Sequence, residues 1–195
     1  MIGVILAGGK SNRFGEEKLL YNVNGKALIT YTIERLLKSK AIEEVVIITL
    51  EERKDKFKDL GVRILIDKLE IGPIGGVYTA LVKLGDVFIA AGDMPNINPK
   101  FVNYIIKEFH KFRPMACVPL WANGYLEPLH AAYSEEFLLV LENQIKKEEY
   151  MLGKAIKTAS THYIQIDSLP FEWRESFFNV NTKRDLKKFK GASRE

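Results

Sequence analysis

Runs of apolar, strand-like residues alternate with helical patterns along this chain, and the connections between them are short. Six runs are predicted to be strands: residues 2–6, 44–50, 62–66, 87–91, 116–120 and 162–166. Most are apolar at nearly every position, which is typical of strands that other elements cover on both faces. This alternation predicts an α/β fold in which a mostly parallel sheet lies between two layers of helices.

Three of the predicted helices carry clear local signals. Apolar residues at helical spacing predict a helix over 27–39 with a buried face of Ile29, Ile33, Leu36 and Leu37. Asn98 followed by Pro99 predicts the start of another helix. Its expected buried face is Phe101, Val102, Ile105, Ile106 and Phe109. Thr182, with Asp185 three residues later, predicts a capping box for a closing helix.

Length and composition exclude several classes of protein. We expect the 195 residues to form a single domain, 1–195, in which residues 186–195 are the closing helix and a polar tail. No apolar run reaches the roughly 20 residues of a membrane span. The net charge is only +4, and the basic residues do not form a stripe with aromatic residues between them. We therefore expect no nucleic-acid partner. A single cysteine, Cys117, suits a cytoplasmic protein, and its apolar neighbours predict a packed side chain rather than a nucleophile.

The first predicted strand leads directly into a glycine-rich, basic segment. Gly8 and Gly9 follow the strand, and Lys10, Arg13 and Lys18 come next. Glycines let the backbone approach a ligand and point N–H groups at it, and the cations would neutralise a polyphosphate. The spacing matches neither of the two familiar glycine-rich phosphate loops. A plain strand-to-helix turn would also explain the two glycines.

Asp93 follows the predicted strand 87–91 and lies between Gly92 and Pro95. Mg²⁺ prefers oxygen ligands and bridges to substrate phosphates, so one or two protein carboxylates suffice to hold it. Asp93 is therefore predicted to be a magnesium ligand. The alternative is a turn-forming or helix-capping aspartate. Asn98 is better placed to cap the next helix, which favours the metal role.

A second group of candidate functional residues begins at the end of the predicted strand 62–66. Asp67 is expected to accept a hydrogen bond from a nucleotide base or a ribose, or else to be a surface turn residue. Pro73 would start a helix, and Gly75 and Gly76 would let its first turn approach a flat ring or a phosphate. Two glycines inside a helix cost about 1 kcal/mol each relative to alanine, which disfavours a purely structural explanation.

Two further groups of polar residues are candidates for substrate contacts. Glu127 and His130 lie in an apolar neighbourhood after an Asn-Gly turn, which predicts an acceptor pocket. A structural role for His130 remains the alternative. Asn179 and Asn181 would point to the same side of an extended segment and bind phosphate or the waters of the metal. Asn181 has an alternative role at the start of the last helix.

Several of these groups follow the carboxyl ends of predicted parallel strands. Gly8, Asp67 and Asp93 each come directly after, or close to, the end of such a strand. Ligands of open α/β sheets bind at this edge, so these residues are predicted to line one cleft.

The chain resembles the molybdenum cofactor guanylyltransferase family. The resemblance rests on the segments LAGGKSNRFGEEK, IDKLEIGPIGG, AGDMP, EPLHAAYS and NVNTKRDL, which occur in the family order. It implies a three-layer α/β/α, Rossmann-like nucleotidyltransferase fold. It also implies transfer of GMP from GTP to molybdopterin, the acceptor form of the cofactor, with Mg²⁺ and release of diphosphate. Molybdoenzymes or cofactor-delivery proteins are implied as transient partners.

The resemblance also assigns residue roles. GTP would contact Leu6, Ala7, Gly8, Lys18 and Asp67, and Asp93 would bind both nucleotide and magnesium; Gly9 is a substrate-binding candidate from the glycine-rich segment itself. Little covalent work is required of such an enzyme, so Arg13 and Lys18 are expected to stabilise the transferring group and the diphosphate.

One departure bears on base selectivity. Some members of the family have an asparagine at the end of the second strand that helps to hold the nucleotide. This chain has Ile47, Ile48, Thr49 and Leu50 there, so that contact is either missing or made by Thr49. The open alternatives are a molybdopterin cytidylyltransferase, a sugar-phosphate nucleotidylyltransferase, a guanylyltransferase for another cofactor, or an inactive nucleotide-binding adaptor.

Overall fold

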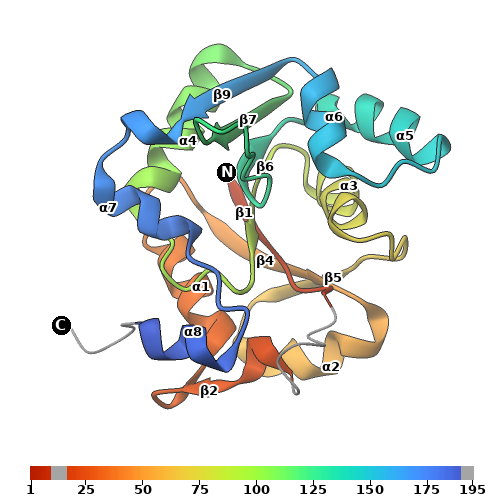
Figure 1. Ribbon diagram of the computed structural model, residues 1–195. Coiled ribbons are helices and arrows are strands. Elements are labelled where there is room, and N and C mark those ends of the chain that lie inside the picture. Colours follow the sequence, from red (N-terminus) through yellow and green to blue (C-terminus); the bar gives the residue numbers. More distant parts are fainter. Residues whose placement is uncertain (10–16, 190–195) are drawn as a thin grey trace.

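A computed structural model, which describes residues 1–9 and 17–189, contains one seven-stranded sheet (Figure 1). The strand order is β5-β4-β1-β6-β8-β7-β9. The strands are β1 (Ile2–Leu6), β4 (Glu44–Thr49), β5 (Arg63–Ile66), β6 (Val87–Ala91), β7 (Ala116–Leu120), β8 (His130–Tyr133) and β9 (Thr161–Gln165). Among the described strands of this sheet, only β8 is antiparallel to both of its neighbours, β6 and β7. The prediction of a mostly parallel sheet is thus confirmed.

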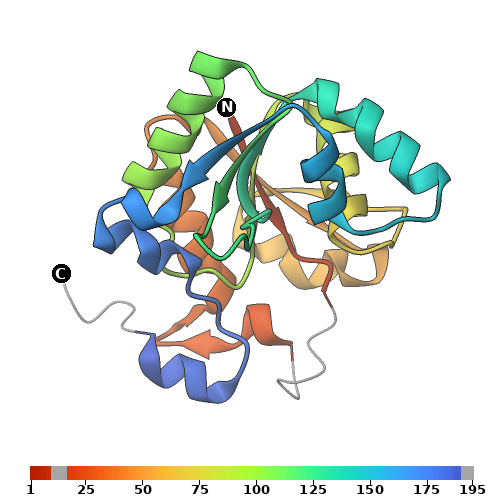
Figure 2. The same ribbon diagram turned by 45° about the horizontal axis from the view of Figure 1, so that its top comes forward.

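Helices cover both faces of the sheet (Figure 2). The helices are α1 (Leu28–Leu37), α2 (Lys54–Phe57), α3 (Pro73–Leu84), α4 (Pro99–Phe112), α5 (Leu138–Lys146), α6 (Leu152–Thr158), α7 (Phe171–Arg174) and α8 (Lys183–Lys188). Side chains of α1, α2 and α4 pack on one face, and those of α3, α5 and α6 pack on the other. A small hairpin of β2 (Asn22–Val23) and β3 (Lys26–Ala27) lies beside α8 at one end of the molecule (Figure 2).

The apolar character of the strands explains this three-layer arrangement. Successive side chains of a strand point to opposite faces of the sheet. In β1, Val4 joins the core under α3 while Ile5 joins the core under α1 and α4. Both are completely buried. A strand that is apolar at every position must be covered on both faces, because an apolar face left exposed to water would not contribute its burial free energy to stability.

The local helix signals are largely confirmed. The side chain of Asn98 accepts a hydrogen bond from the N–H of Lys100 at 2.9 Å, and Pro99 is the first residue of α4. The five apolar residues predicted for the inner face of α4 are all buried. Thr182 and Asp185 form the predicted capping box of α8. One prediction was wrong: Leu37, expected on the buried face of the helix, is 52% exposed at the end of α1.

The strand β8 was not predicted from the sequence. It has only four residues, two of which are alanines, and it is inserted antiparallel between β6 and β7. Its sequence therefore lacks the length and the branched side chains that indicate a strand. In the part of the chain that the structure describes, no helix has the length and apolarity to cross a membrane.

Candidate active site

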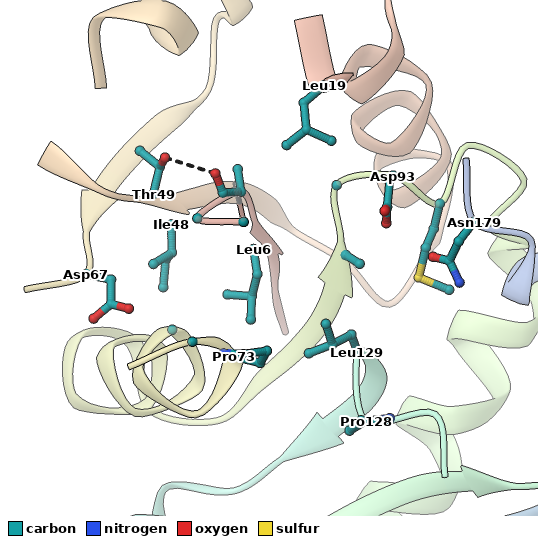
Figure 3. A pocket seen from close by; sticks show the side chains of 18 of the residues that line it. Leu6, Leu19, Ile48, Thr49, Asp67, Pro73, Asp93, Pro128, Leu129 and Asn179 are labelled. Carbon is teal, nitrogen blue, oxygen red and sulfur yellow. Dashed lines mark hydrogen bonds between the residues drawn. The ribbon is translucent and has the colours of Figure 1, made fainter. Parts of the chain in front are cut away.

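A cleft of about 660 Å³ opens at the carboxyl edge of the parallel strands (Figure 3). Eleven of the residues predicted from the sequence line it: Leu6, Ala7, Gly8, Gly9, Lys18, Asp67, Gly76, Asp93, Glu127, Asn179 and Asn181. The predicted convergence of Gly8, Asp67 and Asp93 on one cleft is therefore observed. Arg13, predicted to be catalytic, lies outside the described residues, as does Lys10.

Asp93 and Lys18 form an ion pair in the cleft. The ammonium of Lys18 lies 2.5 Å from Oδ2 of Asp93, and both side chains are largely shielded from solvent. The same ammonium donates to Oδ1 of Asn181 at 3.4 Å. The backbone N–H of Val180 donates to the carbonyl of Asp93 at 3.0 Å, which holds the Asn179–Asn181 segment against the end of β6. Residues far apart in sequence thus form one charged cluster.

Asp67 lies at the other side of the cleft (Figure 3), where it is 5% exposed. Its Oδ1 accepts hydrogen bonds from the N–H of Leu69 at 2.9 Å and from the hydroxyl of Thr79 at 3.2 Å. This burial excludes the alternative of a surface turn residue. Oδ2 faces Gly75, where an added Cβ would lie only 2.8 Å away.

The two helical glycines make room for side chains of this chain. Gly75 does not line the cleft, and it acts through the space that it leaves for the carboxylate of Asp67. The prediction that Gly75 lies in the first helical turn facing the ligand is therefore corrected, because Gly75 packs against Asp67 instead. At Gly76, an added Cβ would lie 2.9 Å from Cδ2 of Leu6. Close packing of α3 on the sheet explains why glycine occupies both positions.

Arg53 was not among the site residues predicted from the sequence. It lies just after β4, is 6% exposed, and donates from Nη1 to the carbonyl of Gly9 at 2.7 Å. Its Nη2 forms an ion pair with Glu17. Arg53 therefore holds both residues that flank the stretch 10–16. No local pattern marks it, since an arginine in a charged segment is ordinarily on the surface.

Thr49, the residue singled out above for base selectivity, has a structural partner. Its hydroxyl donates to the carbonyl of Ala7 at 3.1 Å, and the N–H of Ala7 donates to the carbonyl of Ile48 at 2.8 Å. These bonds attach the start of the glycine segment to β4. Thr49 also borders the cleft, although its side chain is buried.

Glu127 forms part of the wall near β8. A turn at Asn123 and Gly124 brings Trp121 back toward it, and the indole N–H of Trp121 donates to Oε1 of Glu127 at 2.8 Å. Burial raises the pKa of the Glu127 carboxyl, and the indole hydrogen bond opposes that rise.

His130 lies in the core, contrary to the prediction that it contacts substrate. Its ring packs among Phe88, Phe101 and Phe177 with centroid distances of 5.2–5.3 Å, and the side chain is completely buried. Neither ring nitrogen has a hydrogen-bond partner in the described protein. Burial lowers the pKa of His130 to about 3, so the imidazole is neutral. Strand alternation decides this, because residue 130 of β8 points away from the cleft toward α4.

Cys117 is also buried, and burial raises the pKa of its thiol to about 12. It is therefore a packed side chain, as predicted. The thiolate that a nucleophile needs is absent near neutral pH.

The oxygen ligands at the end of β6 suit Mg²⁺. Asp93 offers a carboxylate, and Asn179 and Asn181 line the same cleft; Oδ1 of Asn181 lies 3.4 Å from the Lys18 ammonium that contacts Asp93. Among the described residues, no group of three His, Cys, Asp or Glu side chains is arranged to hold a metal. Since Mg²⁺ commonly binds through one carboxylate together with waters and substrate phosphates, this donor set fits the ion.

The fold and the cleft define the class of protein. A mostly parallel sheet covered on both faces, with a glycine segment and a lysine–aspartate pair at the carboxyl ends of its central strands, is the arrangement of a Rossmann-like nucleotidyltransferase. Residues 3–160 match the model of the MobA-like NTP transferase domain. The chain belongs to this family.

Individual relatives agree with this assignment. The chain is 62% identical to a protein of Thermococcus sibiricus named probable molybdenum cofactor guanylyltransferase, over 98% of each chain. A Pyrococcus horikoshii protein of the same name is 54% identical, over 95% of this chain and 97% of the relative. The crystal structure of molybdopterin-guanine dinucleotide biosynthesis protein A from Archaeoglobus fulgidus superimposes with a TM-score of 0.83 at 28% identity, covering 96% of each chain.

Proposed function

We propose that this protein transfers GMP from GTP to molybdopterin and releases diphosphate. The observation that carries the proposal is the 62% identity, over nearly the whole chain, to a relative named for this activity. The cleft is consistent with it, because polar groups suited to a nucleotide and a metal line one continuous cavity.

The reaction is a substitution at the α-phosphorus of GTP. A phosphate oxygen of the acceptor forms the new P–O bond, and the bond to the diphosphate breaks. The acceptor phosphate is already anionic near neutral pH, so the enzyme needs no strong general base. Alignment and neutralisation of charge supply most of the catalysis.

Lys18 and Asp93 would share the electrostatic work. In our proposal, Lys18 donates to the phosphates and stabilises the charge that develops on the leaving diphosphate. Asp93 would hold Mg²⁺ with help from the asparagine segment, and the bound ion would supply positive charge at the nucleotide phosphates. Arg13 is assigned a similar role to Lys18 from the sequence alone.

The ion pair also neutralises the charges of Lys18 and Asp93 before any ligand binds. Each neutralises the other at 2.5 Å, so neither charge is left unpaired in a partly buried site. When phosphate and metal arrive, each member of the pair gains a new partner of opposite charge. The site is thereby organised without an isolated buried charge at any stage.

Turnover of each of the four nucleoside triphosphates with molybdopterin and Mg²⁺, followed by diphosphate release, tests the proposed activity. We expect GTP to be used in preference to CTP, ATP and UTP. A clear preference for CTP would replace the proposal with a cytidylyltransferase, and no turnover with any nucleotide would refute it.

Asp93→Asn tests the metal site, because it keeps the shape of the side chain and removes its charge. We expect GMP transfer to collapse and GTP affinity, measured by calorimetry, to become insensitive to Mg²⁺. The control is Asp59→Asn, which changes an exposed aspartate that does not line the cleft. A protein with Asp93→Asn that retains the wild-type rate would leave the proposed metal site without its ligand.

A further inference from the structure

The strand order arranges the polar groups of the cleft in a row. Asp67 follows β5, Gly8 follows β1, and Asp93 follows β6. Because β8 is antiparallel, the segment that precedes it, with Glu127, lies at the same edge of the sheet. Four strand intervals separate β5 from β8, which corresponds to roughly 19 Å at about 4.8 Å each. Figure 3 shows Asp67 at one side of the cleft and Asp93 with Asn179 at the other.

The row continues past Asp93 to the segment that precedes β8. A nucleotide that reaches from the Asp67 side to Lys18 and Asp93 ends with its phosphates in the middle of the row. Tyr125, Glu127, Pro128 and Leu129 line the cleft where the segment that precedes β8 meets the end of β6, and the carbonyl of Leu129 accepts a hydrogen bond from the N–H of Ala91 at 3.1 Å. In the proposed reaction, this wall is left for the second substrate.

Glu127 is the charged residue of that wall, and its contacts are distinctive. Trp121 fixes Oε1, and the Trp121 ring in turn packs against Phe177 at 5.5 Å between centroids. In the described part of the chain, Oε2 has no hydrogen-bond partner, and no lysine or arginine forms an ion pair with the carboxylate. An oriented carboxylate without a cation presents acceptors and repels phosphate. It is therefore suited to a ligand that offers N–H donors.

We propose that Glu127 recognises the pterin ring of the acceptor by accepting hydrogen bonds from its amino group and the adjacent ring N–H. The inference rests on the proposed function. These two donors lie side by side on the pterin, as the two oxygens do on a carboxylate. Trp121 uses one lone pair of Oε1, which leaves acceptor sites on both oxygens. Trp121 is a positioning residue, since it acts through Glu127.

Guanine carries the same pair of donors, so the reverse orientation is the competing arrangement. Asp67 would then meet the pterin and Glu127 the guanine. Glu127→Gln separates the two, because glutamine keeps the size of the side chain and replaces one acceptor oxygen with a donor. We expect KM for molybdopterin to rise at least tenfold, while kcat and the Kd for GTP stay within twofold of wild type.

Two variants accompany this measurement. Trp121→Phe keeps an aromatic ring and removes the indole donor. We expect a smaller rise in KM for molybdopterin than in Glu127→Gln, with GTP binding unchanged. Glu136→Gln changes an exposed carboxylate that does not line the cleft, and it should leave all constants unchanged. Circular dichroism establishes that each variant is folded. If the glutamine variant does not fold, Trp121→Phe alone decides the inference.

The outcomes distinguish the inference from the proposed function. Wild-type protein that does not turn over GTP and molybdopterin refutes the proposed function itself. Wild-type turnover with an unchanged KM for molybdopterin in Glu127→Gln overturns only the role of Glu127. A tenfold weaker Kd for GTP in that variant shows that guanine lies at Glu127, and this result also overturns the inference.

Discussion

Replacement of His130 by leucine should change how the stability of the protein depends on pH. The imidazole is buried among aromatic rings, and neither nitrogen has a hydrogen-bond partner within the described residues. Burial lowers its pKa to about 3, whereas an unfolded chain has a histidine pKa of about 6.5. Between these values the unfolded state binds a proton that the folded state excludes. His130 therefore removes stability as the pH falls from about 6.5 toward 3.

The size of the effect follows from the two pKa values. At pH 4.5, two units below the unfolded value, proton binding favours the unfolded state by about 3 kcal/mol. At pH 7.5 the same contribution is close to zero. Leucine has nearly the volume of histidine and does not titrate. The stability of His130→Leu relative to wild type should therefore increase by about 3 kcal/mol between pH 7.5 and pH 4.5.

Guanidinium chloride unfolding at both pH values, followed by circular dichroism, measures this difference. Other titrating groups are common to both proteins, so they cancel when the two free energies are subtracted. At pH 7.5 the loss of aromatic contacts opposes the removal of an unpaired polar group, and we expect a net change within about 1 kcal/mol. A difference between the proteins that does not vary with pH would refute the burial of a neutral imidazole. GMP transfer should be unaffected, since His130 does not line the cleft.

Three other substitutions test contacts in and around the cleft, each by a separate measurement. Lys18→Met should lower kcat about a hundredfold (~2.7 kcal/mol), yet raise the affinity of the nucleotide-free protein for Mn²⁺ because it removes a competing cation. Unchanged Mn²⁺ binding would contradict the competition. Arg53→Met should destabilise the fold by about 3 kcal/mol in chemical unfolding, whereas Lys56→Met, at the exposed end of the same network, should cost less than about 1 kcal/mol. Gly75→Ala should weaken GTP binding by displacing a carboxylate, while Gly153→Ala, in open space, should bind GTP normally; equal affinities would exclude that displacement.

The class of fold and the location of the cleft could be predicted from the sequence because both depend on local patterns. The side chains of a continuously apolar strand are all buried only when helices cover both faces of the sheet. Asn98 with Pro99 and Thr182 with Asp185 satisfy their own helix ends, so no distant residue is needed to interpret them. Glycines and carboxylates at the ends of parallel strands must meet at one edge of the sheet.

The tertiary structure alone decided which polar side chains face the cleft. His130 and Glu127 are three residues apart and looked alike in the sequence, yet the position of His130 in β8 places its side chain on the face of the sheet that α4 covers. Arg53 is identified as an anchor only by its contacts with Gly9 and Glu17, which lie more than thirty residues away. The pairing of Lys18 with Asp93 joins residues 75 positions apart. Local patterns predict which face of one element is apolar, but the pairing of charges across elements depends on how those elements pack together.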